Sequence, residues 1–108
     1  PDWCGAWCTI NVFRVLAIHS LSSNSKIVEE AVRYLRTKQV ERGSWKGYPF
    51  YHTFHALSRA NMNGARKQIQ KALRLICKRQ RKDGGWGKKE RGVDTFLVLD
   101  GLRNIHCI

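Results

Sequence analysis

At 108 residues and 12.5 kDa, the chain can form one domain at most, with a modest core. Its 43% apolar content, nine glycines and two prolines are ordinary for a globular protein, which excludes a disordered chain. No apolar run approaches the roughly 18 residues that cross a bilayer, and the N-terminus does not resemble a signal peptide. We therefore expect neither a membrane span nor a secretory signal.

The net charge of +12 is concentrated in one segment, because residues 66–91 hold eleven Lys and Arg against Asp83 and Glu90. Such a surface could meet an anionic membrane, nucleic acid, diphosphates or an acidic partner, or it could be a solvated helix face. The basic residues flank an apolar stripe on one predicted helix, without a recognisable nucleic-acid module. We therefore expect no nucleic-acid partner.

The first predicted elements are a loop, a buried helix and an amphipathic helix. Residues 1–7 are expected to form the opening loop. Residues 8–21 are apolar on nearly every side, which predicts a buried helix. Residues 22–25, with the sequence SSNS, predict a loop that supplies an N-cap for an amphipathic helix over residues 26–39.

A glycine-containing connection over residues 41–48 follows, and Pro49 suits the start of the next helix. Residues 51–60 are mostly uncharged and predict a second buried helix. After a turn over residues 61–64, residues 65–80 predict a second amphipathic helix, which is strongly basic. A Gly-rich stop over residues 83–92 precedes a third buried helix, which we expect to begin at Asp94 and to end near residue 104.

These elements repeat with a period of 41 residues. A shift of 41 places Ala31 on Ala72, Gln39 on Gln80, Gly43 on Gly84 and Trp45 on Trp86. The buried helices repeat as well, since Phe13, Phe54 and Phe96 align at offsets of 41 and 42. The sequence therefore predicts an all-α chain of three inner and two outer helices, with repeats at about 8–48 and 49–92 and a partial one at 93–108. Because such an array leaves inner helices without partners, we expect a single incomplete segment of a longer protein.

Two copies of one motif resemble a known family: Gln39-x3-Gly43-x-Trp45 and Gln80-x3-Gly84-x-Trp86 look like the glutamine-tryptophan repeats of squalene-hopene and oxidosqualene cyclases. Protein prenyltransferase β-subunits share these repeats more loosely. The opening Trp3-x-Gly5-x-Trp7 resembles a segment of the cyclases' C-terminal half. The resemblance covers essentially the whole chain and implies an α/α toroid, in which outer helices wrap inner ones.

In that family the Gln and Trp tie the end of an outer helix to the start of the next inner helix. A Gln amide can donate to the last carbonyls of its own helix and accept from free amides of the next one. We therefore interpret the four repeat residues Gln39, Trp45, Gln80 and Trp86 as structural.

The resemblance implies a cofactor-free, carbocationic cyclisation of a long polyprene such as squalene. The family protonates its substrate with a D-x-D-D motif followed by Thr at the start of an inner helix. Here only Asp94-Thr95 fits the end of that motif, because Arg91 and Val93 replace the other acids. Asp94 is therefore the one catalytic candidate, although a lone Asp at this position also suits a helix N-cap. We expect the proton donor in an earlier repeat and the segment alone to be inactive.

As part of such an enzyme, the chain would contribute cavity wall. Aromatic faces stabilise carbocations by about 0.5–2 kcal/mol each, and an apolar lining excludes water. The candidates for this wall are Phe13, Tyr51, His52, Phe54, His55 and Phe96. Each aromatic residue could instead belong to an ordinary helix–helix core.

Two other functions stay open. A non-catalytic helical-repeat module would dock a partner protein on its basic face. A prenyltransferase-like enzyme would hold zinc with an Asp, a Cys two residues later and a distant His. Asp94 and His52 fit two of these positions, but Phe96 stands in place of the Cys.

The four cysteines also bear on metal binding and location. The set Cys4, Cys8, His106 and Cys107 has weak spacing for zinc, so we expect no metal and no cofactor. Without a secretory signal, the cysteines indicate reduced thiols in a cytoplasmic protein. Its basic outer helix would suit a peripheral position on an anionic membrane, from which an insoluble substrate could be drawn.

Overall fold

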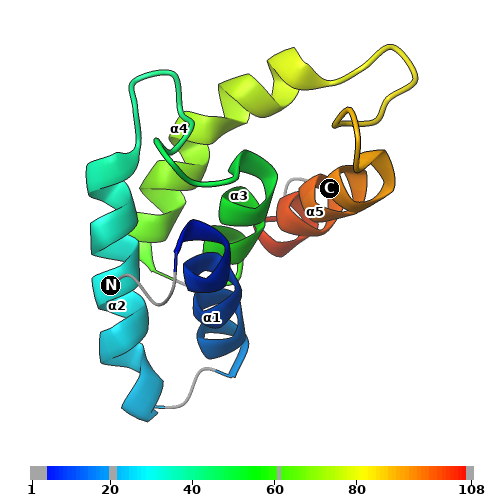
Figure 1. Cartoon of the computed structure of the whole chain (residues 1–108). Coiled ribbons are helices and arrows are strands. Elements are labelled where there is room, and N and C mark those ends of the chain that lie inside the picture. The colour runs from blue at the N-terminus through cyan, green and yellow to red at the C-terminus, as the bar shows by residue number, and fades with distance from the viewer. Residues whose placement is uncertain (1–4, 20–21, 61, 107–108) are drawn as a thin grey trace.

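The computed structural model describes residues 5–19, 22–60 and 62–106, and within these ranges the chain is helical without any strand. These ranges contain five helices: α1 (Ala6–His19), α2 (Ser22–Lys38), α3 (Phe50–Ser58), α4 (Asn63–Arg79) and α5 (Arg91–Asn104) (Figure 1). The prediction of an all-α fold is confirmed.

The helices form two rows. The central helix α3 packs against α1 on one side and α5 on the other, so that α1, α3 and α5 form the first row (Figure 1). The second row consists of α2, which packs against α1, and α4, which packs against α3. The two members of the second row also contact each other.

The core lies between the rows because both α2 and α4 carry one apolar stripe. Residues that are 41 positions apart are buried in pairs: Val28 with Ile69, Ala31 with Ala72, and Leu35 with Ile76. Burying one such aliphatic side chain contributes about 1.5–3 kcal/mol. The stripe that predicted two equivalent amphipathic helices therefore also determines how they pack.

Several predicted helix boundaries are wrong by two to four residues. Trp7 lies in α1 rather than in a loop, and Ser22–Ser25 form the first turn of α2 rather than a connection. The third buried helix begins at Arg91, and the amide of Asp94 donates to the carbonyl of Glu90 (2.8 Å), so Asp94 is not the N-cap. Short polar and acidic residues suit the first turn of a helix as well as its cap, and sequence alone does not separate these positions.

The same loop follows α2 and α4. The Nε2 of Gln39 donates to the carbonyl of Gly43 (3.0 Å), and the Nε2 of Gln80 donates to the carbonyl of Gly84 (2.9 Å). Three main-chain hydrogen bonds at the helix end and in the loop also recur 41 residues apart. The glutamines thus close the loops, whereas we predicted bonds to the last carbonyls of their own helices.

The tryptophans of the two loops contact different partners. The Nε1 of Trp45 donates to a buried glutamine, Gln68 of α4 (2.9 Å), and its ring lies 5.9 Å from that of Phe50 in α3. The Nε1 of Trp86 donates to the carbonyl of Ile76 (2.7 Å), and its main-chain amide donates to Thr95 Oγ1 of α5 (2.9 Å). Each loop therefore has contacts with the first-row helix that follows it.

Gln68 joins the two outer helices and was not predicted. Its side chain is 2% exposed, and its Nε2 donates to the carbonyl of Val32 in α2 (2.8 Å). The main-chain carbonyl of Gln68 accepts a hydrogen bond from Nε2 of Gln39 (2.9 Å). One buried amide thereby connects α2, the first loop and α4.

Candidate functional site

A polar stripe on α3 forms the centre of the candidate site. His52, His55 and Arg59 follow one another at spacings of three and four residues, which places them on one side of the helix. Side chains of α1 and α5 lie beside this stripe. We call it the α3 stripe.

His55 and Asp100 form the best-defined pair of the site. The Nε2 of His55 lies 2.7 Å from Oδ2 of Asp100, and the two side chains are 7% and 11% exposed. The hydrogen bond from His55 is the main reason that the pKa of Asp100 is lowered, while burial lowers the pKa of His55. Both directions fit a neutral imidazole that donates to an ionised carboxylate.

Further cations surround the same carboxylate. Arg59 Nη1 lies 3.6 Å from Oδ2 of Asp100, and Arg103 Nη2 lies 2.9 Å from Oδ1. The remaining ring nitrogen of His55, Nδ1, is buried and has no hydrogen-bond partner among the described residues. Of the two ring nitrogens of His55, Nε2 is therefore bonded to Asp100 and Nδ1 makes no hydrogen bond to a described residue.

Arg14 of α1 lies next to the α3 stripe. Its Nε and Nη2 are buried and lack hydrogen-bond partners within the described part of the chain. Burial lowers the pKa of Arg14, and the like charge of Arg59 lowers it further. The charge of Arg14 also disfavours protonation of His52 and His55, so these groups lie within electrostatic range of one another.

His52 connects α1 to α5. The Trp7 ring meets the His52 ring edge to face, with centroids 4.6 Å apart. Burial is the main reason that the pKa of His52 is lowered, while the charge of Asp94 opposes this. Burial raises the pKa of Asp94, and a side chain at Gly87 would come within 2.8 Å of the Asp94 Cβ. Asp94 is thus held between the loop and His52.

The predicted cavity residues divide into two groups. Phe13 and Phe54 are 0% exposed and belong to the core. Phe96 is 60% exposed, and its ring lies 6.2 Å from that of His55. Tyr51 is partly buried against Phe50, with ring centroids 5.2 Å apart, and burial raises the pKa of Tyr51. His52, His55 and Phe96 are the predicted residues that lie together here.

Five residues of the site were missed by the sequence analysis: Trp7, Arg14, Arg59, Asp100 and Arg103. Arg14 is the one Lys, Arg, Asp or Glu in the apolar sequence of α1, and Asp100 interrupts the apolar end of α5 in the same way. A charge inside a segment that the sequence predicts to be a buried helix was the signal for both, because burying a charge requires a partner or a ligand. Trp7 was assigned to a loop, which hid its position beside His52.

Metal binding and membrane crossing can be examined in the described ranges. Among those residues, no three His, Cys, Asp or Glu side chains lie close enough to hold a metal ion. The two candidate zinc ligands on α3 and α5, His52 and Asp94, interact electrostatically. Cys4 and Cys107 lie outside the described residues, as does the side chain of Cys8. No described helix is long and apolar enough to span a bilayer.

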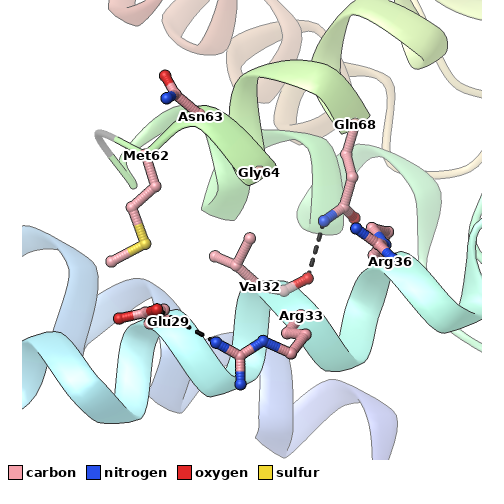
Figure 2. Close-up of a pocket in the computed structure, with 8 residues that line it drawn as sticks. All are labelled: Glu29, Val32, Arg33, Arg36, Met62, Asn63, Gly64 and Gln68. Atoms are coloured by element: carbon pink, nitrogen blue, oxygen red, sulfur yellow. Dashed lines mark hydrogen bonds and ion pairs between the residues drawn. The ribbon is translucent and has the colours of Figure 1, made fainter.

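A separate groove of about 340 Å³ lies between α2 and α4. Figure 2 shows Met62 reaching from the start of α4 toward α2, with Val32 below it and Arg33 and Arg36 along the edge. Glu29 pairs with Arg33 at 3.2 Å on this exposed surface. No residue of the α3 stripe lines the groove.

Comparison with known proteins identifies the family. The sequence model described as the squalene-hopene cyclase C-terminal domain matches residues 2–99. A squalene–hopene cyclase from Bradyrhizobium diazoefficiens is 39% identical over 74 residues, which covers 62% of this chain and 11% of that protein. A probable squalene–hopene cyclase from Sinorhizobium fredii is 32% identical over 78 residues, which covers 66% of this chain and 12% of that protein.

The chain thus spans about a tenth of the length of these curated relatives. No solved structure matches it. Because the family match extends over most of the sequence, this chain belongs to the squalene-hopene cyclase C-terminal domain family.

Proposed function

We propose that this chain is part of a terpene cyclase that cyclises a squalene-type polyprene, and that α1, α3 and α5 contribute wall to its substrate cavity. The observation that carries the proposal is the exposed aromatic surface beside the α3 stripe. Trp7 is 57% exposed and Phe96 is 60% exposed, and each ring lies near a histidine of the stripe. Large exposed aromatic side chains are typical of interaction and binding surfaces.

This surface suits the stabilisation of a carbocation rather than its formation. The faces of Trp7 and Phe96 attract a cation, at about 0.5–2 kcal/mol for each ring. Val93 and Leu99 of α5 are exposed as well and add apolar area that disfavours water. The substrate's charge would then move along the wall while the rings form.

The chain offers no convincing proton donor. The raised pKa of Asp94 is the direction that a general acid requires, and burial is its main cause. However, Arg91 and Val93 occupy the positions of the further acids that make such a donor strong. We therefore propose that the initiating acid belongs to another part of the parent protein, and that Asp94 supports the cavity wall.

The test is product analysis with the natural protein that contains this chain. Squalene is supplied in detergent, and products are identified by mass spectrometry for the wild type, Phe96→Leu, Trp7→Leu and the control Ile27→Ala. Ile27 is a 40% exposed apolar residue of the second row. We expect cyclic products from the wild type and the control, and more incompletely cyclised product from the two aromatic variants. Unconverted squalene in every sample would refute the proposed substrate.

A second part of the proposal concerns the membrane. The solvent-exposed side of α4 carries Lys67, Lys71, Arg74 and Lys78, while its apolar stripe is used in the core. Each basic residue near an anionic bilayer contributes about 1 kcal/mol. We propose that this surface holds the parent protein peripherally on such a membrane, close to the insoluble substrate.

Vesicle sedimentation at low salt tests the membrane part. Vesicles with acidic lipids should retain the wild type, and Lys67→Glu combined with Lys71→Glu should release it. Equal retention by neutral vesicles would contradict an electrostatic surface. If the parent gene also lacks a D-x-D-D motif, the alternative of a non-catalytic docking module on this basic face becomes the better explanation.

A further inference from the structure

The guanidinium of Arg14 belongs to the polar part of the site, which the cavity-wall proposal does not use. Nε and Nη2 are the two nitrogens without partners among the described residues, and both are buried. These nitrogens form one edge of the guanidinium, the edge that binds two oxygens of a carboxylate or phosphate side by side. A desolvated charge without a partner is costly, so this edge is prepared for an anion.

The surroundings of Arg14 supply further positive charge. Arg59 is close enough that its charge lowers the pKa of Arg14, and it lies 3.6 Å from Asp100 without a shorter contact to that carboxylate. Arg59 and Arg103 share the carboxylate of Asp100, whereas Nε and Nη2 of Arg14 have no carboxylate partner among the described residues.

The unused nitrogen of His55 lies in the same region. Its Nδ1 is buried without a partner among the residues that the structure describes, while Nε2 is engaged by Asp100. Because Nε2 donates to Asp100, Nδ1 carries a lone pair while the ring is neutral, and an anion beside it would favour the imidazolium form, whose Nδ1–H would donate to that anion. Arg14 of α1, His55 of α3 and Arg59 at the end of α3 lie within electrostatic range of one another, which makes them candidate donors for one acceptor group.

We propose that Arg14, His55 and Arg59 bind a phosphate-type oxyanion, and that its natural source is the head group of a polyprenyl diphosphate. The second half rests on the proposed function, because a polyprene chain would lie on the aromatic rings beside the stripe. Trp7 contacts His52 and Phe96 lies beside His55, so apolar surface and cations are adjacent. Such a ligand is amphiphilic, with a charged head and an apolar tail, as this surface requires.

The experiment is a calorimetric titration of the natural protein with three probes at constant ionic strength: inorganic pyrophosphate, farnesyl diphosphate and farnesol. The variants are Arg14→Gln, Arg14→Lys and the control Arg33→Gln, which removes a 67% exposed arginine of the outer groove. We expect Arg14→Gln to weaken farnesyl diphosphate binding at least tenfold and Arg14→Lys to weaken it less. Arg33→Gln should leave it unchanged, and farnesol should bind more weakly than the diphosphate.

Several outcomes separate the possible sources of binding. Pyrophosphate that binds as tightly as farnesyl diphosphate, with the same loss in Arg14→Gln, supports the oxyanion site with a free anion as its ligand. Equal weakening by Arg33→Gln, or no weakening by Arg14→Gln, overturns the site and places the anion on the basic outer surface. Failure of every probe to bind the wild type also overturns it.

Two controls protect the interpretation. If circular dichroism shows that Arg14→Gln does not fold, Arg59→Gln replaces it, and unchanged diphosphate binding in that variant overturns the proposal. Binding needs no turnover, so its result is independent of squalene conversion. A protein that cyclises squalene and binds no diphosphate refutes this inference alone, whereas one that binds diphosphate and leaves squalene unchanged refutes the proposed squalene-type substrate.

Discussion

Replacing Gln68 by Leu tests whether one buried amide holds the two outer helices together. The substitution keeps a similar volume but removes the acceptor of the Trp45 indole and the donor to the Val32 carbonyl. A stranded buried donor costs about 1–3 kcal/mol, and we assign about 2 kcal/mol to the indole and about 1 kcal/mol to the carbonyl. The apolar leucine offsets about 1 kcal/mol. We therefore expect the free energy of unfolding to fall by about 2 kcal/mol.

Urea-induced unfolding followed by circular dichroism measures this change. The control Gln70→Leu lies on the exposed side of α4 and should change the free energy of unfolding by less than about 0.5 kcal/mol. Trp45→Phe removes the indole donor, so the double variant Trp45→Phe/Gln68→Leu should cost less than the sum of the single changes. Strict additivity, or a Gln68→Leu variant as stable as the wild type, would refute the reasoning.

Three further sets of substitutions test the tryptophans of the loops, the glycines of the first loop and His55 of the α3 stripe. Trp45→Ala and Trp86→Ala should each lower the free energy of unfolding by about 3 kcal/mol or more, because both indoles are buried; an unchanged melting temperature would contradict the repeat geometry. Gly43 and Gly47 both have positive φ, so Gly47→Ala should lower the free energy of unfolding by roughly 1–3 kcal/mol through backbone strain. Gly43→Ala should lower it further, because a Cβ at Gly43 would also lie within 2.9 Å of Ala72 Cα. Comparing their urea midpoints tests this difference.

The third set tests how His55 affects the pH dependence of the free energy of unfolding. His55 has a folded-state pKa below its ordinary value of 6.5, so the unfolded chain binds more protons there and stability falls as pH drops below about 7. His55→Gln should flatten the loss of stability between about pH 7 and 5, whereas His106→Gln at an exposed position should not. Identical slopes for His55→Gln and the wild type would contradict the assignment of a neutral buried imidazole.

Periodicity predicted the fold because the same physical requirement occurs twice in the chain. The stripe of α2 and its equivalent in α4 bury matching residues, such as Leu35 and Ile76, so one pattern determined both helices. The loop motif was equally informative, since Gln39 and Gln80 make equivalent hydrogen bonds. A repeat is visible in the sequence when the residues that stabilise each copy belong to that same copy.

The remaining features depend on contacts between copies, which periodicity does not encode. Gln68 looks like one more polar residue of a basic helix, and only the packing of α2 on α4 places it over Val32 and Trp45. Its counterpart 41 residues earlier is the exposed Ile27, so no repeat pointed to it. The pairing of His55 with Asp100 likewise joins residues 45 positions apart on different helices.

The polar site follows from how the first row is assembled. Because α3 is packed on both sides, by α1 and α5, polar side chains on its stripe must be satisfied by those neighbours or by a ligand. Asp100 of α5 satisfies His55 and contacts Arg59, whereas α1 brings a second arginine and no acid. The row is therefore neutralised on its α5 side and left positive on its α1 side. That asymmetry, rather than the excess of Lys and Arg on the outer surface, is the reason to look for an anion at Arg14.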